Sequence, residues 1–223
     1  MLKFGYTEYP SGKSILSNKI ENRSDRIRAY LSSSDRLSPE VWTKAYSIDL
    51  VRRVLNVLAP CPAFISEDVY LSVVFAHQCI TDSFIDKTLI RYNTGSGGTA
   101  RKNVSEKSLE RSLNSYKAVI AALEKYFKLF APEFIHLLHD YEVSCISDFI
   151  HNRIGKGNTG KAENRSLLAN MDAYFSRDSL VSYFSSIQLE SEAYRYWFKK
   201  CMSLLARVKR LFKYAKYLFI LRR

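Results

Sequence analysis

Residues 193–223 read AYRYWFKKCMSLLARVKRLFKYAKYLFILRR and contain ten Lys or Arg residues without a single Asp or Glu. On a helix that turns 100° per residue, the apolar residues of this segment fall along one stripe, which includes Trp197, Leu204 and Phe212. The opposite face carries the cations, with Tyr214 and Tyr217 among them. This pattern predicts a long basic C-terminal helix whose apolar stripe packs on the rest of the protein.

The positive charge of the protein is concentrated in this segment. The chain of 223 residues has a formal net charge of +12, of which residues 193–223 supply +10 and the first 192 residues only +2. Clustered Lys and Arg side chains neutralise phosphates, and tyrosine rings stack on bases. The segment is therefore typical of a surface that binds a polyanion.

The remainder of the sequence favours helices. Hydrophobic residues make up 47% of the chain, with only eight glycines and five prolines, and the 3.6-residue period is far more common than two-residue alternation. We expect an all-α fold, a single bundle of about seven or eight helices with a long basic C-terminal helix. Before the terminal helix, the expected helices cover residues 18–32, 39–58, 66–90, 105–130, 132–154, 167–175 and 180–189.

Three regions are expected along the chain. Residues 1–18 should form an irregular N-terminal arm, because Gly5, Pro10 and Gly12 interrupt regular structure. Residues 19–192 should form the helical bundle. Residues 193–223 should form the basic amphipathic helix packed on that bundle.

Two glycine-containing loops add further cations. The loop at residues 92–103 carries Arg101 and Lys102, and the loop at residues 155–164 carries Lys156 and Lys161. Backbone N–H groups in such loops can surround an anion, with the cations behind them. The alternative interpretation is a pair of solvated connectors between helices.

These features together favour a non-enzymatic, nucleic-acid-binding subunit of a nucleoprotein assembly, with RNA or single-stranded DNA as the ligand and other proteins as partners. Arginine and tyrosine side by side suit RNA in particular. Lys and Arg would contact the backbone, Tyr would stack on bases, and no cofactor is expected. The expected contact residues are Arg195, Lys199, Lys200, Arg207, Lys209, Arg210, Lys213, Lys216, Tyr214, Tyr217, Arg101, Lys102, Lys156 and Lys161.

A first alternative is an enzyme that uses two columns of polar residues. Gln78, Asp82 and Asp86 are spaced by four residues, as are Asp140, Ser144, Asp148 and Asn152, so each set would line one face of a helix. If the two faces met, their oxygens would suit Mg²⁺, which in turn binds a diphosphate.

Three short patches resemble motifs of class I terpene synthases. Residues 140–148 resemble that family's metal triad, with Asp148 in place of the usual Glu. Asp82 and Asp86 resemble a reduced form of its aspartate-rich motif, with Ser83 at the position of the second Asp, and Arg195 and Tyr196 resemble its late Arg-Tyr pair. The resemblance implies a metal site at Asp82, Asp86, Asp140, Ser144 and Asp148 that holds Mg²⁺.

A second alternative is a peripheral protein that binds anionic membranes through the terminal helix, whose apolar stripe would enter the headgroup region. No run approaches the roughly 18 apolar residues of a membrane span, and residues 1–9 lack the apolar core of a signal peptide. The four cysteines are widely scattered, which favours a reducing compartment. We therefore expect an intracellular protein, cytoplasmic or in a nucleoid or organelle, that is neither secreted nor transmembrane.

Overall fold

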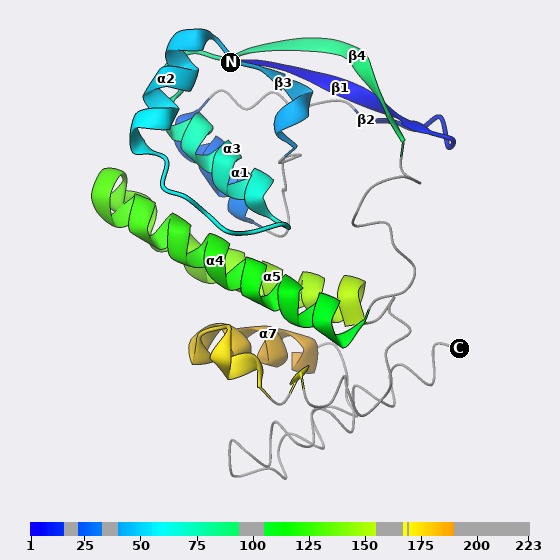
Figure 1. The fold of residues 1–223 in the computed structure, drawn as a ribbon, viewed down its shortest axis with the longest axis vertical. Helices are drawn as coiled ribbons and strands as arrows, with labels where there is room; N and C mark the ends of the chain where they lie inside the picture. Colours follow the sequence, from blue (N-terminus) through cyan, green and yellow to red (C-terminus); the bar gives the residue numbers. More distant parts are fainter. Residues whose placement is uncertain (16–21, 33–39, 94–104, 155–166, 169, 190–223) are drawn as a thin grey trace. The chain divides into compact units, whose positions relative to one another are not determined.

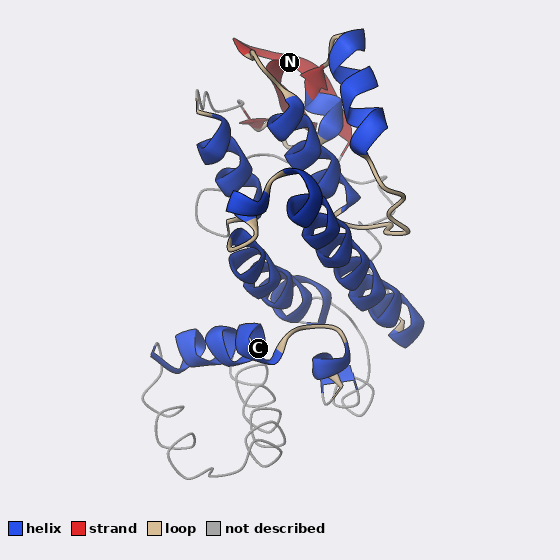
Figure 2. Ribbon diagram, turned by 90° about the vertical axis from the view of Figure 1, so that its left-hand side faces the viewer, coloured by secondary structure: helices blue, strands red, loops and turns tan. Residues whose placement is uncertain are grey.

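The computed structural model describes residues 1–15, 22–32, 40–93, 105–154, 167–168 and 170–189. The chain divides into two compact units, one of Met1–Arg101 with Ser115–Ser144 and the other of Lys102–Asn114 with Cys145–Arg223. Six α-helices and a four-stranded sheet lie within the described residues (Figures 1 and 2). The expected all-α bundle of seven or eight helices is therefore wrong.

The sheet is built around the first strand of the chain. Strand β1 (Leu2–Tyr9) pairs in parallel with β4 (Ser83–Asn93) along its length. It also pairs antiparallel with two short strands, β2 (Ser14–Ile15) and β3 (Lys44–Ala45). Because a strand has only two edges, β2 and β3 share the edge opposite β4. The expectation of an irregular arm at the N-terminus is corrected accordingly: β1 is the central strand.

The C-terminal half of the expected helix 66–90 is also wrong. Helix α3 (Glu67–Gln78) begins as predicted after Ser66 but ends at Gln78, and the chain then continues into strand β4 of the sheet. Residues of β4 such as Ile85, Thr88 and Ile90 are β-branched, a type that favours strands. The strand forms because β1 offers it a partner, with Leu2 opposite Ser83 and Tyr9 opposite Asn93.

Two further helices accompany α3 in the first unit. Helix α1 (Arg23–Leu31) is capped by Asn22, whose side chain accepts a hydrogen bond from the backbone N–H of Ser24. A 3₁₀ turn (Val41–Thr43) and β3 precede helix α2 (Ile48–Val57), so the expected helix from residue 39 starts only at Ile48. Both α1 and α2 pack against α3. Their shared core contains Ile27, Tyr30, Leu31, Leu50, Val54, Val73 and Val74.

The predicted helix over residues 105–130 is confirmed as α4 (Glu106–Phe130), which contributes residues to both units. The expected helix over 132–154 is present in three parts: a 3₁₀ turn (Pro132–Phe134), α5 (Leu137–Asp148) and a π-helical segment (Phe149–Ile154). The second unit continues with a 3₁₀ turn (Met171–Ala173) and α7 (Arg177–Leu189). Its core includes Leu109, Leu113, Ile146, Phe149, Met171 and Phe175.

Aromatic rings cover one face of the sheet. Trp42 stacks on Tyr92 with ring centroids 5.0 Å apart, and Tyr6 meets both rings edge-on. Burial, reinforced by the nearby Glu40 and Glu8 carboxylates, raises the pKa of Tyr6 to about 12. This face is therefore the packed side of the sheet.

A buried ion pair ties the sheet to the helices. The Asp82 carboxylate lies between two cations, with Lys3 Nζ of β1 2.9 Å from Oδ2 and an Arg26 guanidinium nitrogen of α1 2.9 Å from Oδ1. The side chains of Lys3 and Arg26 are only 2% and 3% exposed. Two buried cations therefore contact one carboxylate, and Asp82 offsets part of the cost of burying their charges.

The substitution Asp82→Asn tests this dependence. We expect it to lower the free energy of unfolding by about 3–5 kcal/mol, because it removes the negative charge that the buried Lys3 ammonium and the Arg26 guanidinium contact. Urea denaturation followed by circular dichroism measures the loss. The matched control is Asp86→Asn, which removes an exposed carboxylate four residues away and should cost less than about 0.5 kcal/mol. Equal effects of the two substitutions would contradict the assignment.

Candidate nucleic-acid interface

The residues predicted to contact nucleic acid all lie outside the described residues, as does the whole predicted terminal helix. They belong to three segments, 94–104, 155–166 and 190–223. Their predicted role stays a prediction. The described residues nevertheless bear on it, because their own balance of acids and bases shows where in the chain the net charge lies.

The described part of the chain is electrically balanced. It contains seventeen Lys or Arg residues and seventeen Asp or Glu residues. The entire net charge of +12 therefore belongs to the segments that join and follow the described elements. Dividing the chain into described and other residues therefore separates the net charge more completely than dividing it at residue 193 does.

Several cations of the described part have acidic neighbours of their own. Lys128 lies 2.6 Å from Glu124 one turn earlier on α4, and Arg52 lies 3.5 Å from Asp49 on α2. Such exposed pairs contribute little to stability, roughly 0–1 kcal/mol each. They show that these two cations have local counter-charges.

The first polar column predicted for a metal site does not exist as a helix face. Gln78 is the last residue of α3, Asp82 follows in the connection and Asp86 lies on β4. Both oxygens of Asp82 contact cations, Lys3 and Arg26. The sequence gives Asp82 and Asp86 helical spacing, but the pairing of β1 with β4 separates them.

The second column is helical, although its members differ in environment. On α5, Asp140 is exposed and Ser144 is buried, whereas Asp148 is half-buried at the C-terminal end. Asn152 donates a 2.8 Å hydrogen bond to Asp148, and Arg153 Nε lies 3.8 Å from the same carboxylate. Among the described residues, no group of three or more His, Cys, Asp or Glu side chains is arranged to hold a metal ion.

Among the described basic residues, the one whose pKa departs most from its ordinary value is Lys44, which the sequence did not single out. Lys44 is 8% exposed, and its ammonium donates a 2.7 Å hydrogen bond to the Glu40 carbonyl and lies 5.5 Å from the centre of the Tyr30 ring. Burial lowers the pKa of Lys44 to about 8, against the attraction of Glu40 and Asp68 and with a small repulsion from Lys3. Burial likewise raises the pKa of Asp68 to about 6, together with repulsion from Glu67 and Glu40.

A second polar cluster joins α3 to α4. His77 Nδ1 lies 2.7 Å from the Tyr126 hydroxyl oxygen, and Gln78 Nε2 donates to the same oxygen at 3.1 Å. Burial and the nearby Arg23 guanidinium lower the pKa of His77. A neutral His77 ring accepting a hydrogen bond from Tyr126 fits this geometry, which makes the cluster a contact between helices.

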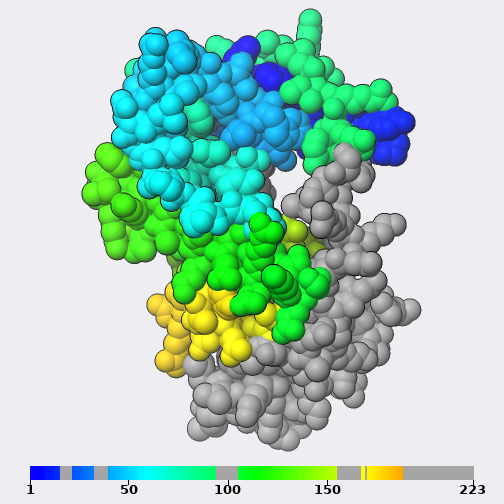
Figure 3. All heavy atoms as spheres, in the orientation of Figure 1, coloured from blue at the N-terminus to red at the C-terminus, as the bar shows by residue number. Residues whose placement is uncertain are grey.

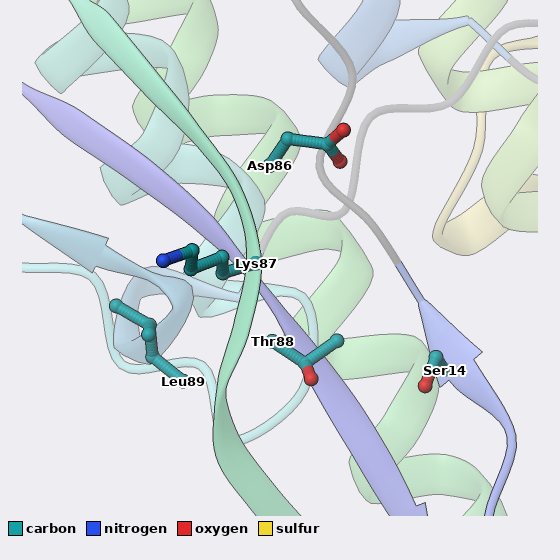
Figure 4. Close-up of a pocket in the computed structure, with 5 residues that line it drawn as sticks. All are labelled: Ser14, Asp86, Lys87, Thr88 and Leu89. Carbon is teal, nitrogen blue, oxygen red and sulfur yellow. The ribbon is translucent and has the colours of Figure 1, made fainter.

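Solvent-exposed aromatic and cationic groups meet on the sheet. The Arg91 guanidinium of β4 lies 4.0 Å from the centre of the Tyr9 ring of β1, and Tyr9 is 46% exposed. A hollow of about 490 Å³ is lined by Ser14, Asp86, Lys87, Thr88 and Leu89 (Figure 4). The side chains of β4 reach the surface of the molecule (Figure 3). These residues are the part of the described chain best suited to contact an extended ligand.

Sequence reasoning missed Tyr9 and Arg91 because it placed them in an irregular arm and at the end of a helix. The sequence carried a signal in Ile90-Arg91-Tyr92-Asn93, where apolar or aromatic residues alternate with polar ones. In the structure the exposure of residues 89–93 alternates in the same way. Two-residue alternation of this kind is the mark of a strand with one packed face.

Comparison of the chain with protein-family models, with curated proteins and with solved structures found no match. None of the described helices combines the length and apolar character needed to cross a membrane.

Replacement of Lys44 by Met tests the buried amine. The folded-state pKa of about 8 lies below the ordinary lysine value of 10.5, so between these pH values the unfolded chain binds a proton that the folded chain does not. The free energy of unfolding should rise with pH across this window, by at most about 1.4 kcal/mol per pH unit. Lys44→Met should abolish that rise.

The measurement is urea denaturation of both proteins at intervals from pH 7.5 to 10. The unfolding free energy of the unsubstituted protein should rise relative to that of Lys44→Met as the pH increases. Lys87→Met, at an exposed position of β4, is the control and should leave the pH dependence unchanged. A difference that stays constant over the range would contradict the depressed pKa.

Proposed function

We propose that this protein binds single-stranded nucleic acid, RNA in the first place, through residues 193–223, as a non-enzymatic subunit of a nucleoprotein assembly. The observation that carries the proposal is the separation of charge. The described elements are neutral, and the net charge of +12 belongs to the other segments, where residues 193–223 alone hold ten cations and no acid.

Counterion release supplies the affinity. Each phosphate neutralised by Lys or Arg releases counterions, so binding weakens steeply as salt is added, by about 0.7 in log K per unit of log salt for each contact with a single strand. Tyr214 and Tyr217 add stacking on bases, about 1–3 kcal/mol for each stacked ring. Several phosphate contacts and two stacked rings are enough for a useful affinity.

The dispersal of the remaining cations favours nucleic acid over a membrane. Arg101 and Lys102 lie in one predicted loop, and Lys156 and Lys161 in another. An extended polyanion is contacted at several separate points, whereas a membrane anchor needs only one. Protein partners would complete the assembly.

Charge reversal in the terminal segment tests the proposal. Arg207, Arg210 and Lys213 are replaced together by Glu, and binding to a labelled single-stranded RNA is followed by fluorescence anisotropy at several salt concentrations. We expect binding to be lost at physiological salt. A milder variant with the same three residues changed to Gln should lower the salt slope by about 2, the contribution of three phosphate contacts.

The matched control reverses three exposed cations of the neutral part, Arg28, Arg52 and Lys125, and therefore changes the net charge by the same amount. This control should retain most of the RNA affinity. Circular dichroism verifies that each variant is folded. Binding that is insensitive to salt, or equal loss in both triple variants, would count against the proposal. Sedimentation with anionic vesicles and not with RNA would favour a membrane surface instead.

A further inference from the structure

One face of the sheet carries a row of polar side chains across three strands. Arg91 of β4 is opposite Thr7 of β1, and Thr7 is opposite Ser14 of β2. Residues opposite each other in a sheet direct their side chains to the same face. The Thr7 and Ser14 hydroxyl oxygens lie 3.5 Å apart, in agreement with this arrangement.

Tyr9 extends the row at its cationic end. It follows Thr7 by two positions on β1 and so shares its face, and its ring lies under the Arg91 guanidinium at 4.0 Å. Arg91 is exposed, and Tyr9 keeps 46% of its surface accessible. A phenol ring paired with a guanidinium plane is a flat, positively charged platform. Bases stack on both kinds of group, and phosphates pair with the guanidinium.

The hollow adjoins this row. Ser14 belongs both to the row and to the lining of the hollow, and Thr88 lines it from β4. Thr88 is opposite Gly5 of β1, which has no side chain to occupy the space. Figure 4 shows that the side chains of Asp86 and Thr88 point to the side of β4 on which Ser14 lies, whereas those of Lys87 and Leu89 point to the other side.

The chemistry of the hollow indicates what kind of group it accepts. The Asp86 carboxylate accepts hydrogen bonds and repels a phosphate. The Ser14 and Thr88 hydroxyls donate or accept as required. A group with N–H donors on a flat ring suits this set, and carboxylates accept from the exocyclic amine of cytosine in the same way.

We infer that this face of the sheet is a second contact surface for single-stranded nucleic acid, on which Tyr9 stacks a base, Arg91 pairs with a phosphate, and Asp86 accepts from the amino group of another base further along the nucleic acid. The inference rests on the proposed function and adds a base preference to it. Cytosine carries an amino group and uracil does not, so the surface favours cytosine over uracil.

The test measures binding of oligo-cytidine and oligo-uridine RNAs of equal length to the full chain by fluorescence anisotropy. The unsubstituted protein should bind oligo-cytidine about fivefold or more tightly, and Asp86→Ala should bring the two affinities together. Tyr9→Ala should weaken binding to both RNAs by at least about fivefold, whereas Tyr9→Phe, which keeps the ring, should bind like the unsubstituted protein. Thermal unfolding confirms that the variants are folded.

The outcomes separate the inference from the proposal on which it rests. Suppose that charge reversal at Arg207, Arg210 and Lys213 abolishes binding, while Tyr9→Ala and Asp86→Ala bind both RNAs like the unsubstituted protein. The sheet surface is then overturned and the proposed function stands. If the unsubstituted protein binds neither RNA, both fail. Equal affinity for the two RNAs before any substitution overturns the assigned role of Asp86.

Discussion

The carboxylate of Asp82 is the constraint on which the first unit depends. It contacts Lys3 of the central strand and Arg26 of α1 at 2.9 Å each, in a setting where both cations are almost fully buried. A buried cation without a partner costs several kcal/mol, so the contacts of Asp82 couple the stability of the strand, the helix and the start of β4. The aspartate resembles a metal ligand in sequence and serves as an internal counter-ion in the fold.

Charge is divided unevenly between the described elements and the rest of the chain. Within the described elements, acids and bases are equal in number, which avoids the self-repulsion that a high net charge imposes on a compact structure. The surplus cations belong to residues outside the described elements. If the proposed function holds, this division lets the protein carry the charge that binds a polyanion while the described elements stay electrically balanced.

The sequence predicted secondary structure correctly where the local residue pattern determines it. Helix α4 was predicted within one residue at its start and at its end, since its apolar residues repeat with the helical period and no other contact competes. Strand β4 was missed because Asp82 and Asp86 also have helical spacing, and only the distant β1 selects the strand. Lys44 and the Arg91 and Tyr9 pair were missed for the same reason. Tyr9 and Arg91 are far apart in the chain, and Lys44 is buried by the fold although its hydrogen bond to Glu40 is local, so spacing reveals neither environment.

The parallel pairing of β1 with β4 affects how the chain acquires its structure. The N-terminal amino group donates to the Thr81 carbonyl, 80 positions further along the chain, and β4 follows directly. Contacts of such long range form slowly, because the entropy cost of closing a large loop must be met before the contacts lower the free energy. As the ribosome extends the chain, the first strand is synthesised long before its longest neighbour exists. Until then the opening segment exposes backbone groups that attract chaperones or other nascent chains.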